Sequence, residues 1–222
     1  MTDRAIVFDF DGVLADSESL HLSAFQDAFR ARGWTLERAA YFERYLGFDD
    51  EGTVRAFAED AKVIVTDDEV ASLVRTKTER FAALMDAGAM MYPGASAAIA
   101  RLGARYRLGI ASGSTGAEIT AILQKAGLHA PFRVIISADD VERSKPAADP
   151  YVAAVSRLGV APSAAVAIED SRWGLTSARA AGLHAIGITT SYSAKELSAA
   201  DVVVASLDEI TLDLVESVFN DA

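Results

Sequence analysis

The chain has 222 residues, of which 51% are hydrophobic and 24% charged, and it contains no cysteine. This length is enough to bury a substantial core, and the lack of cysteine excludes disulfides and thiolate sites. A formal net charge of -11 argues against a nucleic-acid partner, because phosphate backbones bind basic surfaces. There is no leader-like start and no apolar run near the roughly 18 residues of a membrane span. We therefore expect a soluble, cytoplasmic monomer that binds neither nucleic acid nor membrane.

The first 89 residues predict one strand followed by helices. The apolar run AIVFD at residues 5–9 predicts a buried strand. Phe25 and Phe29 share one helical face, which predicts a helix from about Ser17 that Gly33 ends. Further helical patterns continue to about residue 89. The clearest has Thr66 as N-cap and Glu69 three residues later, the spacing of a capping box.

From residue 91 onward, short β-rich runs alternate with helical stretches. The runs lie at residues 107–112, 133–137, 165–170, 184–189 and 201–205. Gly127, Gly159 and Gly182 are placed to end the helices between them. This alternation predicts an α/β fold, with a Rossmann-like parallel sheet covered by helices on both faces. The first strand joins that sheet, so the expected core comprises residues 1–16 and 90–222, and residues 17–89 form an inserted α-helical domain.

Polar side chains follow four of the predicted strands at the point where each strand ends. They are Asp9 and Asp11 after the first strand, Ser112, Gly113 and Ser114 after the next, then Lys145, and finally Glu169 and Asp170. Ligands of open α/β sheets bind beyond the carboxyl ends of the strands. We therefore expect these residues to form one site.

The residue types at these strand ends suit phosphoryl transfer. A set of carboxylate oxygens favours a hard divalent cation such as magnesium (Mg2+) over zinc. Lys145 and the loop from Ser112 to Ser114 complement a phosphate group. Asp9 is placed to act as nucleophile and Asp11 to act as general acid and base, while Gly12 lets the backbone turn tightly beside the ligand.

Each of these features also has an ordinary structural interpretation. Two aspartates at a strand end can form a solvated turn, and Ser112 can cap the following helix. Lys145 can be a surface lysine, and Glu169 with Asp170 can end a strand before a helix. Four such coincidences at four strand ends are less plausible than one site, so we favour the functional interpretation.

The segments DFDGVLADSE, IASGS, SKP and IEDSRWG resemble the four motifs of the haloacid dehalogenase superfamily of phosphotransferases. Their order matches, and the place of the insertion resembles the branch with a small α-helical cap. The resemblance implies a nucleophilic Asp9, an acid–base Asp11, a phosphate-binding Ser112 and a charge-balancing Lys145. It also implies magnesium held by Asp9, the backbone carbonyl of Asp11 and Asp170, with Glu169 assisting.

Within the superfamily, Asp11 argues against the branch that cleaves carbon–halogen bonds, since that branch carries no aspartate there. The substrate is then a phosphoester, and the cap is expected to select it. Relatives with similar motifs are β-phosphoglucomutases and sugar-phosphate phosphatases, which makes His21 and Lys77 candidate substrate-binding residues. The alternatives are a solvated histidine and a lysine on the exposed face of an amphipathic helix.

One departure favours a phosphatase over a mutase. The mutases hold a second phosphate with an arginine after a Leu-x-Gly stretch, where this sequence has Asp49 and Asp50. Two carboxylates repel a distal phosphate. We expect hydrolysis of a small phosphorylated metabolite, a sugar phosphate or a phosphoglycolate-like compound, with a β-phosphoglucomutase-type mutase as the alternative.

Two further classes share the strand-end pattern. A phosphorylatable receiver domain also places acids, a hydroxyl and a lysine around magnesium, but it is shorter and has no such insertion. A ligand-binding module has no use for a nucleophile and an acid two residues apart. Sustained release of phosphate distinguishes an enzyme from both.

Overall fold

The computed structural model describes residues 3–85 and 91–220, and the chain in it divides into two compact units. The core unit comprises Met1–Asp16 and Met91–Ala222, and the helical unit comprises Ser17–Met90. The boundary expected at residues 89 and 90 falls outside the described residues. Among those residues, no helix is both long and apolar enough to cross a membrane.

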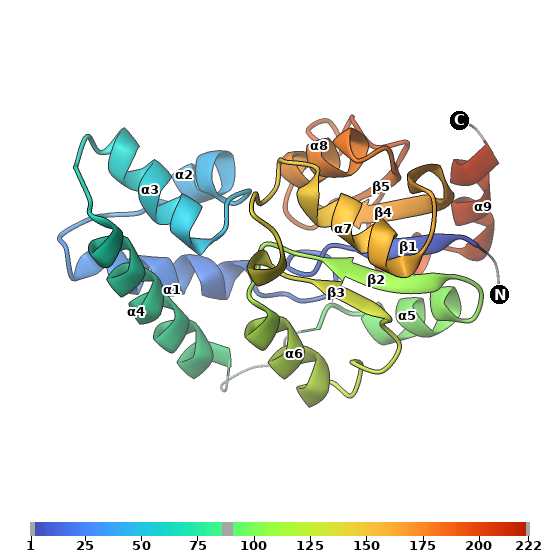
Figure 1. The fold of residues 1–222 in the computed structure, drawn as a ribbon, viewed down its shortest axis with the longest axis horizontal. Coiled ribbons are helices and arrows are strands. Elements are labelled where there is room, and N and C mark those ends of the chain that lie inside the picture. Colours follow the sequence, from blue (N-terminus) through green and yellow to red (C-terminus); the bar gives the residue numbers. More distant parts are fainter. Residues whose placement is uncertain (1–2, 86–90, 221–222) are drawn as a thin grey trace. The chain divides into compact units, whose positions relative to one another are not determined.

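The core unit is built on a six-stranded, wholly parallel sheet with the order β3-β2-β1-β4-β5-β6 (Figure 1). The strands are β1 (Ala5–Phe8), β2 (Arg107–Ala111), β3 (Val134–Ile136), β4 (Ala165–Glu169), β5 (His184–Ile188) and β6 (Val202–Val204). The predicted α/β fold is therefore confirmed. Every residue of β1 is buried, because β1 lies in the middle of the sheet with helices over both faces.

Helices cover both faces of this sheet. They are α5 (Ala95–Gly103), α6 (Gly116–Lys125), α7 (Asp149–Leu158), α8 (Arg172–Ala180) and α9 (Leu212–Asn220), with short 3-10 turns at Ala138–Asp140, Pro162–Ala164 and Leu207–Glu209. Helices α7 and α8 pack together on one face, and α5 and α9 lie on the other (Figure 1). As predicted, Gly127, Gly159 and Gly182 adopt left-handed conformations just after α6, α7 and α8.

The strand order places the end of β1 at a switch in chain direction. From β1 the chain moves outward through β2 to β3, then returns across the sheet to β4 on the other side of β1. Because parallel crossovers are right-handed, the connecting helices change face where the chain reverses direction between β3 and β4. A crevice opens at such a switch point beyond the strand ends, which is where ligands of this class of sheet bind.

The helical unit contains α1 (Glu18–Arg30), α2 (Arg38–Ala40), the π-helical turn η1 (Tyr41–Tyr45), α3 (Asp50–Asp60) and α4 (Asp67–Met85). None of its described residues forms a strand, as predicted. The predicted capping box is present, since Glu69 Oε2 accepts from the Thr66 backbone N–H at 2.9 Å and Thr66 Oγ accepts from that of Glu69 at 3.3 Å.

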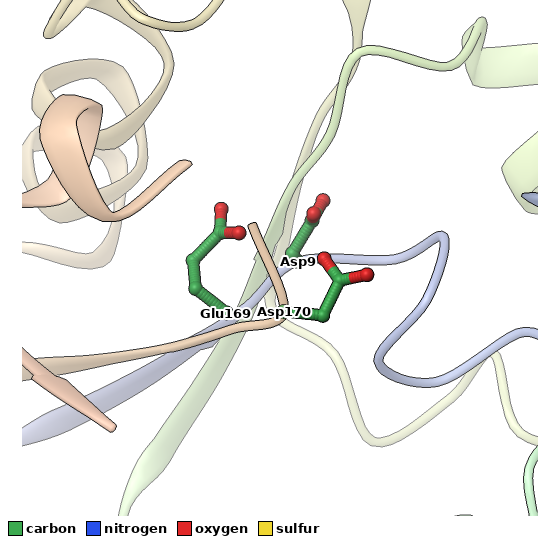
Figure 2. A group of neighbouring side chains, drawn as sticks. All are labelled: Asp9, Glu169 and Asp170. Carbon is green, nitrogen blue, oxygen red and sulfur yellow. The ribbon is translucent and has the colours of Figure 1, made fainter. Parts of the chain in front are cut away.

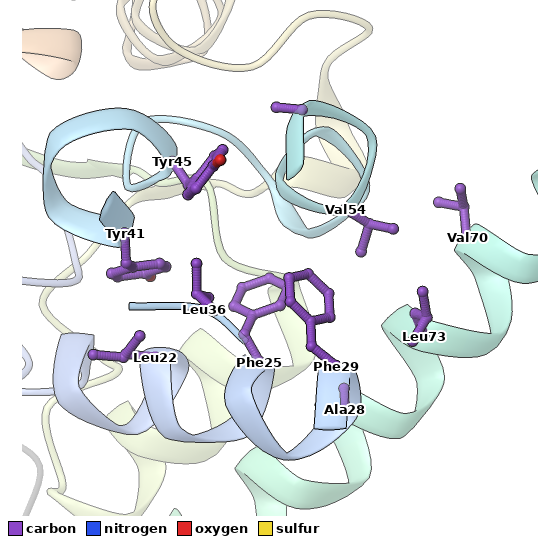
Figure 3. Packing of buried hydrophobic residues seen from close by; sticks show 11 residues of the cluster. Leu22, Phe25, Ala28, Phe29, Leu36, Tyr41, Tyr45, Val54, Val70 and Leu73 are labelled. Carbon is purple, nitrogen blue, oxygen red and sulfur yellow. The ribbon is translucent and has the colours of Figure 1, made fainter. Parts of the chain in front are cut away.

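An aromatic cluster holds the helical unit together (Figure 3). Phe25 and Phe29 project from α1 between the neighbouring helices, and the rings of Phe29 and Phe57 lie 4.7 Å apart. Trp34 and Tyr41 pack within the same cluster. Burial of each such ring stabilises the unit by roughly 1.5–3 kcal/mol, which explains how a unit without a sheet keeps its own core.

Candidate active site

Three carboxylates meet where β1 and β4 end. Oxygen atoms of Asp9, Glu169 and Asp170 all lie within 4.8 Å of one another, and the three side chains project from the neighbouring strand ends (Figure 2). The strand register causes this, since Phe8 pairs with Ile168 and the Asp9 N–H donates to the Ile168 carbonyl at 2.9 Å. The residues that follow on the two strands are consequently neighbours.

Lys145 bridges two of these carboxylates. Its Nζ lies 2.8 Å from Asp9 Oδ1 and 2.6 Å from Glu169 Oε1, and the side chain is only 7% exposed. Lys145 comes from the loop between β3 and α7, so a third strand end contributes to the cluster. One ammonium against three carboxylates leaves the cluster with excess negative charge.

Burial and mutual repulsion disturb the titration of this cluster. Burial, followed by the charge of Glu169, raises the pKa of Asp9 well above its usual value, and Lys145 opposes that rise. The same two causes raise the pKa of Asp170 to about 7. Burial opposes the charge on Lys145, but the attraction of Asp9 and Glu169 is stronger and raises the pKa of the lysine. The cluster would gain from a further cation.

Asp170 fits the role of a metal ligand. Both its carboxylate oxygens are buried and neither has a hydrogen-bond partner among the described residues, although nearby Ser191 lowers its pKa. The backbone of Gly12 passes directly against this carboxylate with φ at 77°, and a Cβ at Gly12 would overlap it. Buried, unpartnered carboxylate oxygens in an all-oxygen set suit a hard divalent cation such as magnesium.

The second aspartate is held by the serine-rich loop. Ser114 Oγ donates to Asp11 Oδ2 at 2.6 Å, and Ser112 Oγ donates to the same oxygen at 3.3 Å. Ser112 Oγ also accepts from the Ser114 backbone N–H at 3.0 Å, so the turn through Gly113 is tightly closed. The structure thus brings the predicted loop after β2 and the predicted acid after β1 together.

Tyr151 is a site residue that the sequence analysis missed. Its hydroxyl donates to Glu169 Oε1 at 2.6 Å, and the side chain is fully buried. Burial and the charge of Glu169 raise the pKa of the phenol well above its usual value. In the sequence, a tyrosine at the start of a helix looks the same as any core aromatic residue, so no signal distinguished it.

Gly174 and Ser171 were also missed. Ser171 is the N-cap of α8, where its Oγ accepts from the Gly174 N–H at 3.0 Å and donates to Glu169 Oε2 at 3.3 Å. A Cβ at Gly174 would overlap the Glu169 carboxylate. The glycine five residues after Glu169 in the stretch IEDSRWG was the available signal, because a glycine inside a helix costs about 1 kcal/mol unless space requires it.

His21 and Lys77, the two predicted residues of the helical unit, are both buried. Lys77 is 0% exposed, its Nζ lies 2.8 Å from Asp50 Oδ2, and it stands over the rings of Phe25 and Phe81. The His21 ring stacks on Phe81 with centroids 4.1 Å apart. The interpretation of these two residues as a solvated histidine and an exposed lysine is therefore wrong.

The two aspartates that depart from the mutase pattern have structural partners. Asp49 is the N-cap of α3, and its Oδ1 accepts from the Gly52 N–H at 2.7 Å. Asp50 forms the ion pair with Lys77. Both carboxylates are thus engaged within the helical unit.

Comparison with known proteins identifies the class. The model of the haloacid dehalogenase-like hydrolase family matches residues 6–188, and the chain belongs to this family. Protein CbbY of Rhodobacter capsulatus is 35% identical over 209 residues, which cover 89% of this chain and 91% of the relative. Validoxylamine A 7'-phosphate phosphatase of Streptomyces hygroscopicus subsp. limoneus is 30% identical over 217 residues, with coverage of 93% and 95%.

Solved structures agree with this assignment. CbbY from Rhodobacter sphaeroides in complex with phosphate superposes with a TM-score of 0.86 at 34% identity, covering 96% of this chain and 99% of that one. A mutant of the same protein in complex with xylulose-(1,5)bisphosphate gives a TM-score of 0.85, with coverage of 95% and 97%. The resemblance seen in the sequence is confirmed, and the chain is a phosphoric monoester hydrolase of this family.

Proposed function

We propose that this chain is a magnesium-dependent phosphatase that hydrolyses a small phosphorylated sugar through an aspartyl-phosphate intermediate on Asp9. The observation that carries the proposal is the buried cluster of Asp9, Glu169 and Asp170, with Lys145 bound to Asp9. The cluster combines a carboxylate nucleophile, a fixed ammonium and a place for a cation, which together serve phosphoryl transfer.

Asp9, Asp170 and the backbone carbonyl of Asp11 would hold the magnesium ion, with Glu169 assisting. When bound, magnesium neutralises charge on the phosphoryl oxygens and on the carboxylates around it. The buried oxygens of Asp170 support this assignment, because no hydrogen bond of good geometry among the described residues offsets the cost of burying them.

In the first step, a carboxylate oxygen of Asp9 attacks phosphorus. A new bond forms between that oxygen and phosphorus, while the bond from phosphorus to the ester oxygen breaks. Asp11, as general acid, gives its proton to the departing sugar oxygen, so the sugar leaves as an alcohol. Lys145 stays beside Asp9 and reduces repulsion between the carboxylate and the incoming phosphate.

In the second step, Asp11 acts as general base. It takes a proton from a water molecule, whose oxygen then attacks phosphorus and breaks the bond to Asp9. Inorganic phosphate is released and the Asp9 carboxylate is restored. The hydroxyls of Ser112 and Ser114, with the backbone at Gly113 and Gly12, would bind the phosphoryl oxygens. The two hydroxyls already donate to a carboxyl oxygen, that of Asp11.

For the substrate, we propose a phosphorylated pentose or hexose, and xylulose 1,5-bisphosphate is the compound that tests whether a second phosphate is accepted despite Asp49 and Asp50. The CbbY protein that binds it is 34% identical over nearly the whole chain. Asp49 and Asp50 favour hydrolysis over a mutase reaction, because neither offers a cation for a second phosphate. His21 remains a candidate for contact with the sugar, whereas the charge of Lys77 is already engaged by Asp50.

Phosphorus NMR of the purified protein tests this function. The protein is mixed with magnesium and with β-glucose 1-phosphate, hexose 6-phosphates, pentose phosphates, xylulose 1,5-bisphosphate and phosphoglycolate. We expect inorganic phosphate to accumulate from one sugar phosphate over many turnovers and to stop when EDTA removes the metal. The Asp9→Asn variant should remain folded and release none.

Three results would contradict the proposal. Conversion of glucose 1-phosphate to glucose 6-phosphate without free phosphate would identify a mutase. Phosphorylation of the protein without sustained release would identify a receiver-like domain. Turnover by Asp9→Asn near the wild-type rate would exclude Asp9 as the nucleophile.

A further inference from the structure

A continuous row of polar contacts links helix α7 to the reacting carboxylate. The Tyr151 hydroxyl donates to Glu169 Oε1 at 2.6 Å, and Lys145 Nζ lies 2.6 Å from that same oxygen. Lys145 continues to Asp9 Oδ1 at 2.8 Å. Three polar contacts therefore link Tyr151 to Asp9 through Glu169 and Lys145.

The fold gives Tyr151 little freedom. It is the third residue of α7, a helix that packs on β1, β2 and β3, and its side chain is fully buried. The Lys145 ammonium lies 5.2 Å from the centre of its ring, so the same side chain also contacts the lysine through its face. Because the ring is buried and packed against Lys145, the direction of the Tyr151 hydroxyl is fixed.

Packing alone does not require the hydroxyl. A phenylalanine fills nearly the same volume, and burying a phenol without a partner costs roughly 1–3 kcal/mol. Glu169 supplies that partner, although its Oε1 already accepts from Lys145. The Tyr151 hydroxyl is thus a second donor to an oxygen that Lys145 already contacts, and its role depends on how it affects the position of Lys145.

The charge of the Glu169 carboxylate determines how loss of the Tyr151 hydroxyl would affect Lys145. Glu169 is fully buried, and the Ser171 hydroxyl reaches its other oxygen at the longer distance of 3.3 Å. Without the phenol, Oε1 would depend on Lys145 alone for a strong donor, and the ammonium would be drawn toward Glu169. Asp9 would then lose part of its counter-ion.

We propose that Tyr151 is a positioning residue whose hydroxyl shares the Glu169 carboxylate with Lys145 and so keeps the Lys145 ammonium on Asp9. The proposal rests on the proposed function only for the role of Asp9 as nucleophile. The position of the lysine is a property of the free protein, so it can be measured whether or not a substrate is known.

The chain offers a matched control in Tyr106. Its hydroxyl donates to Glu216 Oε1, also at 2.6 Å, and the residue is 3% exposed. Tyr106 lies just before the amino end of β2, at the opposite end of that strand from Ser112. Tyr106→Phe removes a tyrosine–glutamate hydrogen bond of the same length from the core unit, although a less buried one, and leaves the carboxylate cluster unchanged.

The first readout is the lysine ammonium signal in nitrogen-correlated NMR of the metal-free, substrate-free protein, assigned with the Lys145→Arg variant. A buried ammonium held between two carboxylates exchanges its protons slowly. We expect Tyr151→Phe to shift the Lys145 signal and to speed its exchange by about tenfold or more, which corresponds to about 1.4 kcal/mol. Tyr106→Phe should leave the signal unchanged.

The second readout is steady-state kinetics with the substrate found by phosphorus NMR. Tyr151→Phe should lower kcat about tenfold while KM changes less than about twofold, since binding groups remain in place. Tyr106→Phe should keep kcat within about twofold of wild type. Both variants should remain folded, and Tyr106→Phe should lose no more stability than Tyr151→Phe, because its hydrogen bond is only part-buried.

An unchanged Lys145 signal in Tyr151→Phe would overturn the proposal, as would equal losses of kcat in the two tyrosine variants. If wild type itself releases no phosphate, the proposed function fails while the ammonium signal still tests Tyr151. A shifted signal with a kcat within twofold of wild type would also overturn the proposal, because the position of the lysine would then not affect the reaction.

Discussion

Two lysines are buried in the described part of the chain, one in each unit. Their surroundings differ, and the difference distinguishes a lysine of the active site from a lysine that stabilises helix packing. Lys145 of the core unit lies between Asp9 and Glu169, with Asp170 beside them. Lys77 of the helical unit pairs with Asp50 and lies over two phenylalanine rings. Both lysines have carboxylate and aromatic neighbours.

The difference is in the balance of charge. The core cluster holds three carboxylates around one ammonium, and burial together with the charge of Glu169 raises the pKa values of Asp9 and Asp170. A fold gains no stability from such an excess, which is why the cluster indicates a ligand. An ion pair between helices with rings around it, as at Lys77, is a common way to fix helix packing.

Replacing Lys145 gives the largest effect expected from this comparison. Lys145→Ala leaves Asp9 without its ammonium, so the carboxylate and the phosphate repel each other during attack. We expect kcat/KM to fall by at least about 100-fold, or roughly 2.7 kcal/mol, measured by phosphate release. A loss below about tenfold would show that Lys145 does not balance charge in the reaction.

Replacing Lys77 should affect stability instead. Lys77→Met keeps most of the packing but leaves Asp50, whose side chain is 18% exposed, without the ammonium. We expect the free energy of unfolding to fall by about 1–3 kcal/mol, somewhat less than for a fully buried pair. Urea unfolding followed by Trp34 fluorescence in a Trp173→Phe background reports on the helical unit alone.

The double variant Lys77→Met/Asp50→Asn is the control for that measurement. It should recover part of the lost stability, because no unpaired charge remains. Unchanged unfolding together with a raised KM would contradict a structural role and would assign the charge of Lys77 to substrate binding.

A smaller effect is expected from Gly174. Alanine would usually stabilise a helix relative to glycine by up to about 1 kcal/mol. Here its Cβ would overlap the Glu169 carboxylate and displace it from Lys145. We expect Gly174→Ala to lower kcat about tenfold. Gly116→Ala in α6, where the nearest atom lies 3.4 Å from the added Cβ, should stay near wild type.

The smallest expected effect is on stability and concerns Asp170. In the metal-free protein its pKa is about 7, above the ordinary 3.8, because burial and Glu169 disfavour the charge. The native state therefore holds a proton more tightly than the unfolded state, and stability is lost as pH rises from about 4 through 7. Asparagine at this position removes that loss.

We expect Asp170→Asn to raise the melting temperature in EDTA at pH 8 by at least about 3 °C, or roughly 1 kcal/mol, with a smaller rise at pH 5. Added magnesium should stabilise wild type and not the variant. Equal melting temperatures of the two proteins at pH 8 would show that Asp170 is not destabilised by its surroundings.

Much of the fold followed from the sequence because the relevant signals are local. Alternating β-rich runs and helix-ending glycines such as Gly159 mark the elements, and parallel strands place Asp9 and Asp170 at one edge. The π-helical turn at Tyr41–Tyr45 was not predicted, since it differs from an α-helix only by one inserted residue.

The contacts that could not be predicted join residues that are far apart in the sequence. Tyr151 meets Glu169 because α7 packs on β1, the strand that pairs with β4, and nothing in the residues beside Tyr151 in the sequence shows this contact. The sequence pattern of its own helix places Lys77 on an exposed face, yet the side chain is buried and pairs with Asp50 of another helix. Sequence spacing shows on which face of its helix or strand a side chain lies, but not which residues of other elements it contacts.

The most direct test of Asp9 as nucleophile is to trap the acyl phosphate. The enzyme is quenched during turnover with magnesium and substrate, reduced with borohydride, and digested for mass spectrometry. Borohydride converts an aspartyl phosphate to homoserine, so homoserine should be found at position 9 in wild type and be absent from Asp9→Asn. Homoserine at a different aspartate, or none at all under conditions that trap a known aspartyl phosphate, would contradict the proposed mechanism.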